Sequence, residues 1–149
     1  MQPGPGFGGP CLEKDLMALV ELGNFYDLES TFMKAILKRN ERQVELILDK
    51  ITSEIKQAGS LITVLGLSFK ANTDDIRNSA SIKLINLLLK KGYKVNSYDP
   101  KAKYSLQSEN YLQFDNLYSS LNKSKCAVIM TEWDDFKNLN FIKISKLMT

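Results

Sequence analysis

Three residues near the start of the sequence could do covalent and acid–base chemistry together. Cys11, Lys14 and Asp15 follow directly after a loop, residues 4–10, that holds four glycines and two prolines. Glycine lets a backbone approach a ligand closely, and proline restricts the turns between the glycines. The pattern from Leu12 onward is helical, so the cysteine stands at a predicted helix N-terminus, where backbone N–H groups favour a thiolate. Asp15 lies one helical turn further on the same face, so thiol, cation and carboxylate converge beside a loop able to cradle a substrate.

The alternative interpretation of this cluster is structural, because a free cysteine is often a small buried hydrophobic residue. The polar neighbours of Cys11, among them Glu13, Lys14 and Asp15, argue against a position in an apolar core. The sequence contains no histidine, which removes the commonest general base and metal ligand. Any catalysis would therefore depend on cysteine, lysine, aspartate or glutamate.

Composition limits the remaining classes of function. The chain has 149 residues, of which 44% are hydrophobic, and this suffices for the core of one domain or slightly more. A net charge of +3 with scattered lysines does not indicate a nucleic-acid-binding protein. We expect no membrane span, because no apolar run is long enough, and no signal peptide, because the sequence starts with a Gly/Pro loop. Two cysteines do not form a disulfide framework, so we expect a reducing compartment, the cytoplasm.

The sequence divides near Gly59 into a helical part and an α/β part. In the helical part, residues 1–58, everything after the glycine-rich loop has a helical pattern. The first helix is predicted from residue 12 to 22. Gly23 is its expected C-cap, because glycine readily adopts the left-handed conformation that ends many helices.

A second helix is predicted from about residue 28 to 57. Its apolar residues fall on one stripe at helical spacing, namely Val44, Ile47, Leu48, Ile51 and Ile55. Two interpretations stay open, ordinary packing within the chain and an interface with another subunit. If the stripe is not covered within the chain, it would meet a partner helix, from another subunit or from a helical segment outside this sequence, and the isolated chain would self-associate or expose apolar surface.

The second part, residues 59–149, alternates short apolar runs with helical segments. Strands are predicted at 61–67, 93–98 and 126–130, and helices at 81–91, around 115–121 and from 142 to 147. This β-α-β-α-β-α order is typical of a doubly wound, Rossmann-like α/β fold with a parallel sheet. Such sheets bind ligands beyond the carboxyl ends of their strands.

The loop after the first predicted strand, residues 68–79, lies at that edge. Its cations Lys70 and Arg77 are either solvated surface charges or anion ligands, and their place before a helix start favours anion binding. The loop lacks a GxGxxG turn, so it is not an obvious dinucleotide site. Trp133, after the third strand, could stack on a ligand or cover the core. Cys126 lies in an apolar strand and is predicted to be a core residue.

Several motifs in series resemble the UDP-glucose/GDP-mannose dehydrogenase family. In chain order they are Gly6-Phe7-Gly8-Gly9 with Cys11, Lys14 and Asp15; Gly66-Leu67-Ser68-Phe69-Lys70 with Thr73-Asp74-Asp75, Arg77 and Ser79; Tyr98-Asp99-Pro100; and Thr131-Glu132-Trp133 with Phe136. Their order and rough spacing agree along almost the whole chain, which is more specific than any one motif alone. The phenylalanine of the loop and the Thr-Glu-Trp element resemble the UDP-glucose 6-dehydrogenase branch more than the N-acetylmannosamine branch.

The resemblance implies a two-step oxidation of the C6 alcohol of UDP-glucose to the carboxylate of UDP-glucuronate, with NAD as cofactor. In this chemistry Cys11 would form a thiohemiacetal and then a thioester, and Asp15 would assist proton transfer or position water. Lys14 would lie near NAD, and Arg77 would reach toward it. The expected contacts of the UDP-sugar are Gly6, Phe7, Gly8, Phe69 and Lys70.

The resemblance also implies a division of the chain. Residues 1–58 would be the end of a central dimerisation domain with the catalytic loop. Residues 59–149 would be a UDP-sugar-binding domain truncated at its C-terminus, with an incomplete doubly wound sheet that lacks its last strand. The family's NAD-binding domain is missing from the sequence, so we expect the chain to be inactive alone and to need that domain as a partner, within a homodimer formed through the central helices. Pro10 stands where the family commonly has serine. The alternative function is a non-catalytic sugar-nucleotide-binding or oligomerisation fragment that retains the loop as a relic.

Overall fold

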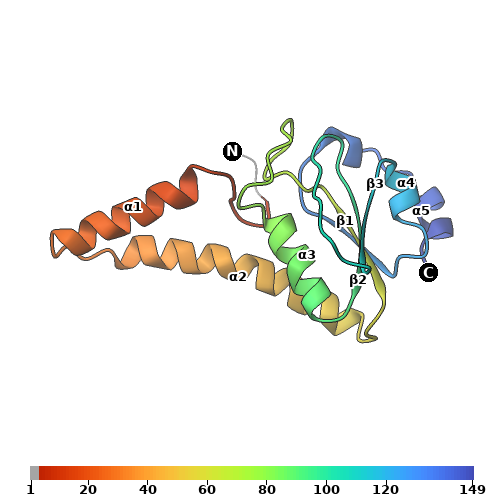
Figure 1. The fold of residues 1–149 in the computed structure, drawn as a ribbon, viewed down its shortest axis with the longest axis horizontal. Coiled ribbons are helices and arrows are strands. Elements are labelled where there is room, and N and C mark those ends of the chain that lie inside the picture. The colour runs from red at the N-terminus through yellow and green to blue at the C-terminus, as the bar shows by residue number, and fades with distance from the viewer. Residues whose placement is uncertain (1–3) are drawn as a thin grey trace.

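A helical hairpin and a parallel sheet make up the fold of this chain, in a computed structural model that describes residues 4–149 (Figure 1). The first three residues of the predicted helical part lie outside the described residues. Helix α1 (Leu12–Phe25) lies beside helix α2 (Thr31–Glu54), and α1 with the first half of α2 extends away from the sheet. Cys11 is the N-cap of α1, which confirms its predicted place at a helix N-terminus.

The α/β half contains four strands, which confirms the predicted fold class. Its elements are β1 (Leu61–Leu65), α3 (Ala80–Lys90), β2 (Lys94–Tyr98), β3 (Tyr111–Phe114), α4 (Leu117–Ser120), β4 (Cys126–Ile129), the 3₁₀ helix η1 (Asp134–Phe136) and α5 (Phe141–Leu147). All strand pairs are parallel, in the order β3-β2-β1-β4. The carboxyl ends of β1, β2 and β4 therefore meet at one edge of the sheet, where a doubly wound fold binds its ligands.

Each face of the sheet is covered by its own apolar cluster. One cluster joins the sheet to α3 and the last turns of α2, with Ile62, Val64, Leu84 and Leu88 fully buried. The other joins the opposite face to α4, η1 and α5, with Leu65 and Leu121 at its centre. Figure 1 shows these helices on the two sides of the strands.

The apolar stripe of α2 belongs to the first of these clusters. Val44, Leu48 and Ile51 are buried, and Ile47 and Ile55 pack against the same cluster while partly exposed. The stripe thus covers α3 and the sheet of its own chain, so the first interpretation, ordinary packing within the chain, is confirmed, and the alternative of a subunit interface along this stripe is wrong. The physical reason is the length of α2, whose second half reaches past the hairpin and over the sheet.

Two further predictions need correction. Gly23 does not end α1, which continues to Phe25; instead its carbonyl accepts a bond from the Leu28 N–H, and an added Cβ would lie 3.1 Å from the Cβ of Ser30. Gly23 therefore allows the following turn to pack closely on the helix. The strict β-α alternation is also wrong, because β3 follows β2 with no helix between them.

The segment between β2 and β3 is held by side-chain bonds instead of a helix. Gln113 of β3 accepts a hydrogen bond from the backbone N–H of Tyr104 and donates one to the carbonyl of Ala102. Among residues 4–149, no helix combines the length and apolar character needed to cross a bilayer.

Candidate functional site

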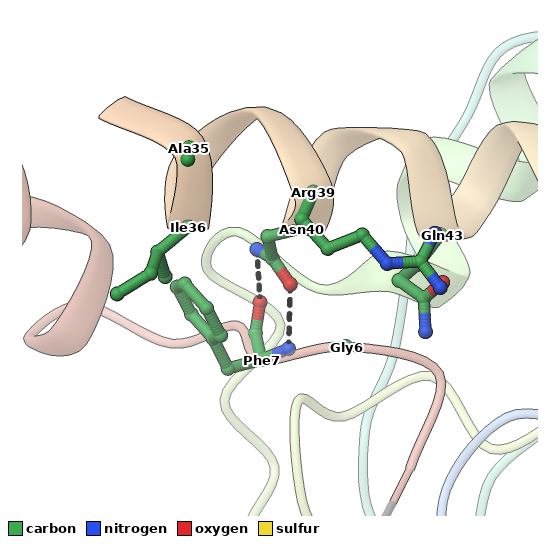
Figure 2. A pocket seen from close by; sticks show the side chains of 7 residues that line it. All are labelled: Gly6, Phe7, Ala35, Ile36, Arg39, Asn40 and Gln43. Carbon is green, nitrogen blue, oxygen red and sulfur yellow. Dashed lines mark hydrogen bonds between the residues drawn. The ribbon is translucent and has the colours of Figure 1, made fainter. Parts of the chain in front are cut away.

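The glycine-rich loop lies against the middle of α2, where one side chain binds it twice. The Phe7 N–H donates to Oδ1 of Asn40 at 2.8 Å, and Nδ2 of Asn40 donates to the Phe7 carbonyl at 2.9 Å. Figure 2 shows both bonds, with the Phe7 ring pointing toward Ile36. An open hollow of about 400 Å³ lies between the loop and the helix, and it is lined by Gly6, Phe7, Ala35, Ile36, Arg39, Asn40 and Gln43.

The other side of the loop rests on the loop after β1. The Gly9 N–H donates to the carbonyl of Arg77 at 3.0 Å. A Cβ on Gly8 would lie 2.5 Å from the Asn78 carbonyl oxygen, and one on Gly9 would lie 2.8 Å from the Phe69 ring, with the backbone of Gly9 at a φ of +85°. Both glycines are thus required by contacts within the protein, whatever else the loop binds.

Cys11 lies at the surface where this loop enters α1. Its thiol is free and exposed, so the prediction of an accessible cysteine is confirmed. The Asp15 N–H donates to the Cys11 carbonyl at 2.8 Å, which places the two residues one turn apart as expected. Lys14 and Asp15 are exposed. The three predicted groups therefore share one open helix terminus.

Arg77 is brought close to this terminus from the other half of the chain. Its guanidinium binds Asp75 through Nε at 3.0 Å and Nη2 at 2.6 Å, and its side chain is 69% exposed. The pKa of Arg77 is raised, mainly by its hydrogen bond and charge pairing with Asp75 and in smaller part by the Cys11 sulfur. The same pairing lowers the pKa of the Asp75 carboxyl. Cys11 therefore lies within electrostatic reach of an exposed cation.

Phe69 and Lys70 follow the carboxyl end of β1 on the same loop. Phe69 is half-buried beneath Gly9, and the exposed Lys70 ammonium lies 5.5 Å from the centre of its ring. The structure thus brings Phe69 and Arg77 to the glycine-rich loop before Cys11, whereas Cys126 lies in β4. Cys126 is a half-buried residue packed on the core, and burial raises the pKa of its thiol.

Asp99 organises the loops at this edge, a role that sequence reasoning missed. Its side chain is only 3% exposed. One oxygen, Oδ2, accepts bonds from the N–H groups of Leu67 and Ser68 at 2.6 and 3.1 Å and from Nε1 of Trp133 at 3.1 Å. The other oxygen, Oδ1, accepts hydrogen bonds from the N–H groups of Lys101 at 2.9 Å and Ala102 at 2.7 Å. The available signal was an aspartate at a strand end, in the Tyr-Asp-Pro motif.

The bond to Asp99 also settles the position of Trp133. The indole is 5% exposed and packs with Leu65, Leu117 and Phe136, so it covers the core. Because the indole is buried, it does not present a face on which a ligand could stack. Within the described part of the chain, no three acidic, cysteine or histidine side chains are grouped so that they could hold a metal ion.

Two family models match the chain. The model described as the UDP-glucose/GDP-mannose dehydrogenase family, UDP binding domain, matches residues 63–149. The model of the same family's central domain matches residues 1–42. The two matches fall on the α/β half and on the hairpin with its glycine-rich loop.

Curated relatives match the chain over nearly its whole length. UDP-glucose 6-dehydrogenase of Rickettsia conorii is 36% identical, and the match covers 99% of this chain and 36% of the relative. UDP-glucose 6-dehydrogenase TuaD of Bacillus subtilis is 30% identical, with 99% of this chain and 33% of the relative covered. The chain thus spans about a third of the length of these relatives.

Solved structures give the same picture. A UDP-glucose dehydrogenase from the hyperthermophilic archaeon Pyrobaculum islandicum superposes with a TM-score of 0.87 at 30% identity, covering 93% of this chain and 33% of that one. A UDP-D-ManNAc dehydrogenase from Pyrococcus horikoshii superposes with a TM-score of 0.81 at 27% identity, covering 99% and 34%. The similarity includes both the hairpin and the sheet.

Proposed function

Because the chain belongs to the UDP-glucose/GDP-mannose dehydrogenase family, we propose that it provides the nucleophilic thiol and the UDP-sugar contacts of an NAD-dependent UDP-glucose 6-dehydrogenase. The observation that carries this proposal is the contact between the loop before Cys11 and the loop after β1. The Gly9–Arg77 bond joins them, so a sugar nucleotide held at the sheet edge would have its sugar near the thiol.

In the proposed chemistry the Cys11 sulfur adds to the C6 aldehyde of the sugar, and the new C–S bond holds that carbon through the second oxidation. Water then attacks the resulting thioester carbon, the C–S bond breaks, and the carboxylate leaves as the thiol is restored. Asp15, one turn away and exposed, would take the proton from water or orient it. The thiol is free and exposed at the start of α1, so the sugar carbon can reach it.

This chain would supply only a few of the contacts to NAD. The loop after β1 has a single glycine, Gly66, in place of a GxGxxG turn. The exposed cations Lys14 and Arg77 fit contacts with the phosphates or ribose of NAD. NAD, when bound, accepts the hydride that leaves C6, and we expect the chain alone to be inactive because it holds no complete site for this cofactor.

The UDP-sugar would lie over the sheet edge. Phe69 is half-buried and Lys70 is exposed beside it, so together they offer an apolar surface and a point charge for a sugar and a phosphate. Gly6, Phe7 and Gly8 would line the sugar from the other side.

We also propose that the chain forms a homodimer, and that its interface is the exposed surface of the α1–α2 hairpin and not the buried apolar stripe of α2. Large apolar side chains on the hairpin are exposed, including Phe25 at 80% and Phe32 at 71%. Burial of such a surface is the usual driving force for subunit association. Both cysteines are free, which fits the cytoplasm as the compartment.

Protection of Cys11 from alkylation by iodoacetamide tests the proposed function. Saturating UDP-glucose should slow the alkylation of Cys11, whereas glucose 1-phosphate should not, because it lacks the nucleotide. Peptide mass spectrometry separates this thiol from Cys126, which serves as the internal reference. UDP-glucose binding without protection of Cys11 would favour the non-catalytic sugar-nucleotide-binding fragment. No binding at all would contradict both of these functions and favour an oligomerisation fragment.

A further inference from the structure

We propose that Asn40 is a positioning residue for the loop that carries Cys11; the importance of that thiol rests on the proposed function, but the positioning itself does not. Asn40 does not touch the thiol. It binds the backbone of Phe7, four residues before Cys11, through two hydrogen bonds of 2.8 and 2.9 Å. The inference is that α2 sets the conformation of the loop through this one side chain.

The chemistry of the side chain suits this role. A carboxamide carries a donor and an acceptor in one plane, so it can satisfy the N–H and the C=O of a single residue, as a neighbouring strand would. Asparagine is a poor choice for a helix interior on propensity alone, and Asn40 lies well inside α2. Its two hydrogen bonds to Phe7 explain why an asparagine occupies this helix position.

Asn40 is also the principal polar tether on its side of the loop. Residues 4–8 make no other hydrogen bond to any described residue. The open hollow lies beside Gly6 and Phe7, and Asn40 makes its two hydrogen bonds to the loop at the edge of this hollow (Figure 2). Gly6 fits tightly, because a Cβ there would lie 2.5 Å from Oδ1 of Asn40.

The constraint at Phe7 is passed along the chain to Cys11. Two residues later, Gly9 is bonded to Arg77 and lies against Phe69. Pro10 then fixes its own φ immediately before the cysteine. With Phe7 attached to α2 and Gly9 attached to the loop after β1, little freedom remains for the start of α1.

Amide hydrogen exchange on the whole 149-residue chain, read residue by residue by NMR, tests the proposal. In Asn40→Ala the Gly9 amide should exchange faster by at least about tenfold, although Gly9 is not a partner of Asn40, because the loop loosens as a unit. The Met130 amide, bonded to Leu65 within the sheet, should keep its native rate. Gln43→Ala is the matched control, since Gln43 lines the same hollow from α2 and makes no hydrogen bond to the described loop residues.

Faster exchange at Phe7 with a native rate at Gly9 would overturn the proposal, because the contact would then be local. If Asn40→Ala does not fold, the same exchange measurement is made on Asn40→Asp, whose side chain is nearly the same size as asparagine. This variant keeps the acceptor for the Phe7 N–H but places a carboxylate oxygen against the Phe7 carbonyl. Its Gly9 amide should exchange several-fold faster than in the native chain, and a native rate would again overturn the proposal. Failure of UDP-glucose to protect Cys11 in the native chain would contradict the proposed function and leave the positioning result untouched.

Discussion

The backbone N–H of Gly9 donates to the backbone carbonyl of Arg77 at 3.0 Å, across 68 residues of sequence. This bond joins the loop before Cys11 to the loop after β1 through main-chain groups alone. A side chain at Gly9, whose φ is +85°, would collide with the ring of Phe69 on that second loop. The contact between these two loops therefore depends on a glycine.

Gly9→Ala should destabilise the chain by about 2–4 kcal/mol, because it combines backbone strain with a clash against the Phe69 ring. Gly59→Ala is the control, since Gly59 has a φ of +80° but no atom within 4 Å of its added Cβ. That variant should lose only the strain, about 1 kcal/mol. Urea unfolding measures both, and equal losses would show that the contact with Phe69 has no energetic weight.

Asp99→Asn should destabilise the chain by about 2–4 kcal/mol, because a buried amide would turn its NH₂ group toward donors that now bind a carboxylate. The emission of Trp133, the single tryptophan, should also change as its Nε1 loses an acceptor. Asp49→Asn, at an exposed position on α2, should leave both properties as they are. A native unfolding curve and emission spectrum in Asp99→Asn would refute the organising role of Asp99.

The local features of this fold could be predicted from sequence, and the long-range ones could not. The hairpin helices, β1, β2 and β4 follow from periodicity and apolar runs, and the Cys11 loop follows from its residue types. Strand β3 was missed because four residues with a polar glutamine carry little pattern, and parallel pairing with β2 stabilises them. Asn40 and Asp99 were missed as site residues because the loops that they hold, at Phe7 for Asn40 and at Leu67 for Asp99, lie more than 30 positions away.

Arg77→Gln should raise the pKa of Asp75 toward its ordinary value, since the hydrogen bond from Arg77 is the main cause of the present lowering. A carboxyl whose pKa is lowered by folding stabilises the folded state above its unfolded pKa, near 4. The contribution is lost as the pH falls through the lowered value, so native and variant chains should converge in stability in acid. NMR titration of Asp75 gives the pKa, with Lys70→Gln as the control on the same loop. An unchanged pKa in Arg77→Gln would show that the pair does not persist in solution.

The exposed hairpin predicts self-association of the isolated chain. Phe25→Lys combined with Phe32→Lys should shift the chain toward monomer, because both side chains are exposed and would be buried between subunits. Phe141→Lys is a matched control, since Phe141 on α5 is 73% exposed but lies outside the hairpin. Sedimentation equilibrium reports the association state. A native chain that is monomeric at all concentrations, or a dimer broken only by Phe141→Lys, would contradict a hairpin interface.

Lys70→Ala should weaken UDP-glucose binding by about 1.5–3 kcal/mol, the usual range for a hydrogen bond to a charged group. The reason is its place: Lys70 follows the carboxyl end of β1, is exposed, and has no carboxylate paired with it among the described residues, so its charge is available to a phosphate or sugar hydroxyl. Lys103→Ala removes a lysine that is paired with Asp115 and should leave binding nearly unchanged. NAD should bind the native chain weakly, and neither substitution should alter that, since the loop after β1 lacks a GxGxxG turn. Calorimetric titration with each ligand separates the two expectations: tight NAD binding without UDP-glucose binding would overturn the assignment of this sheet edge to the sugar nucleotide.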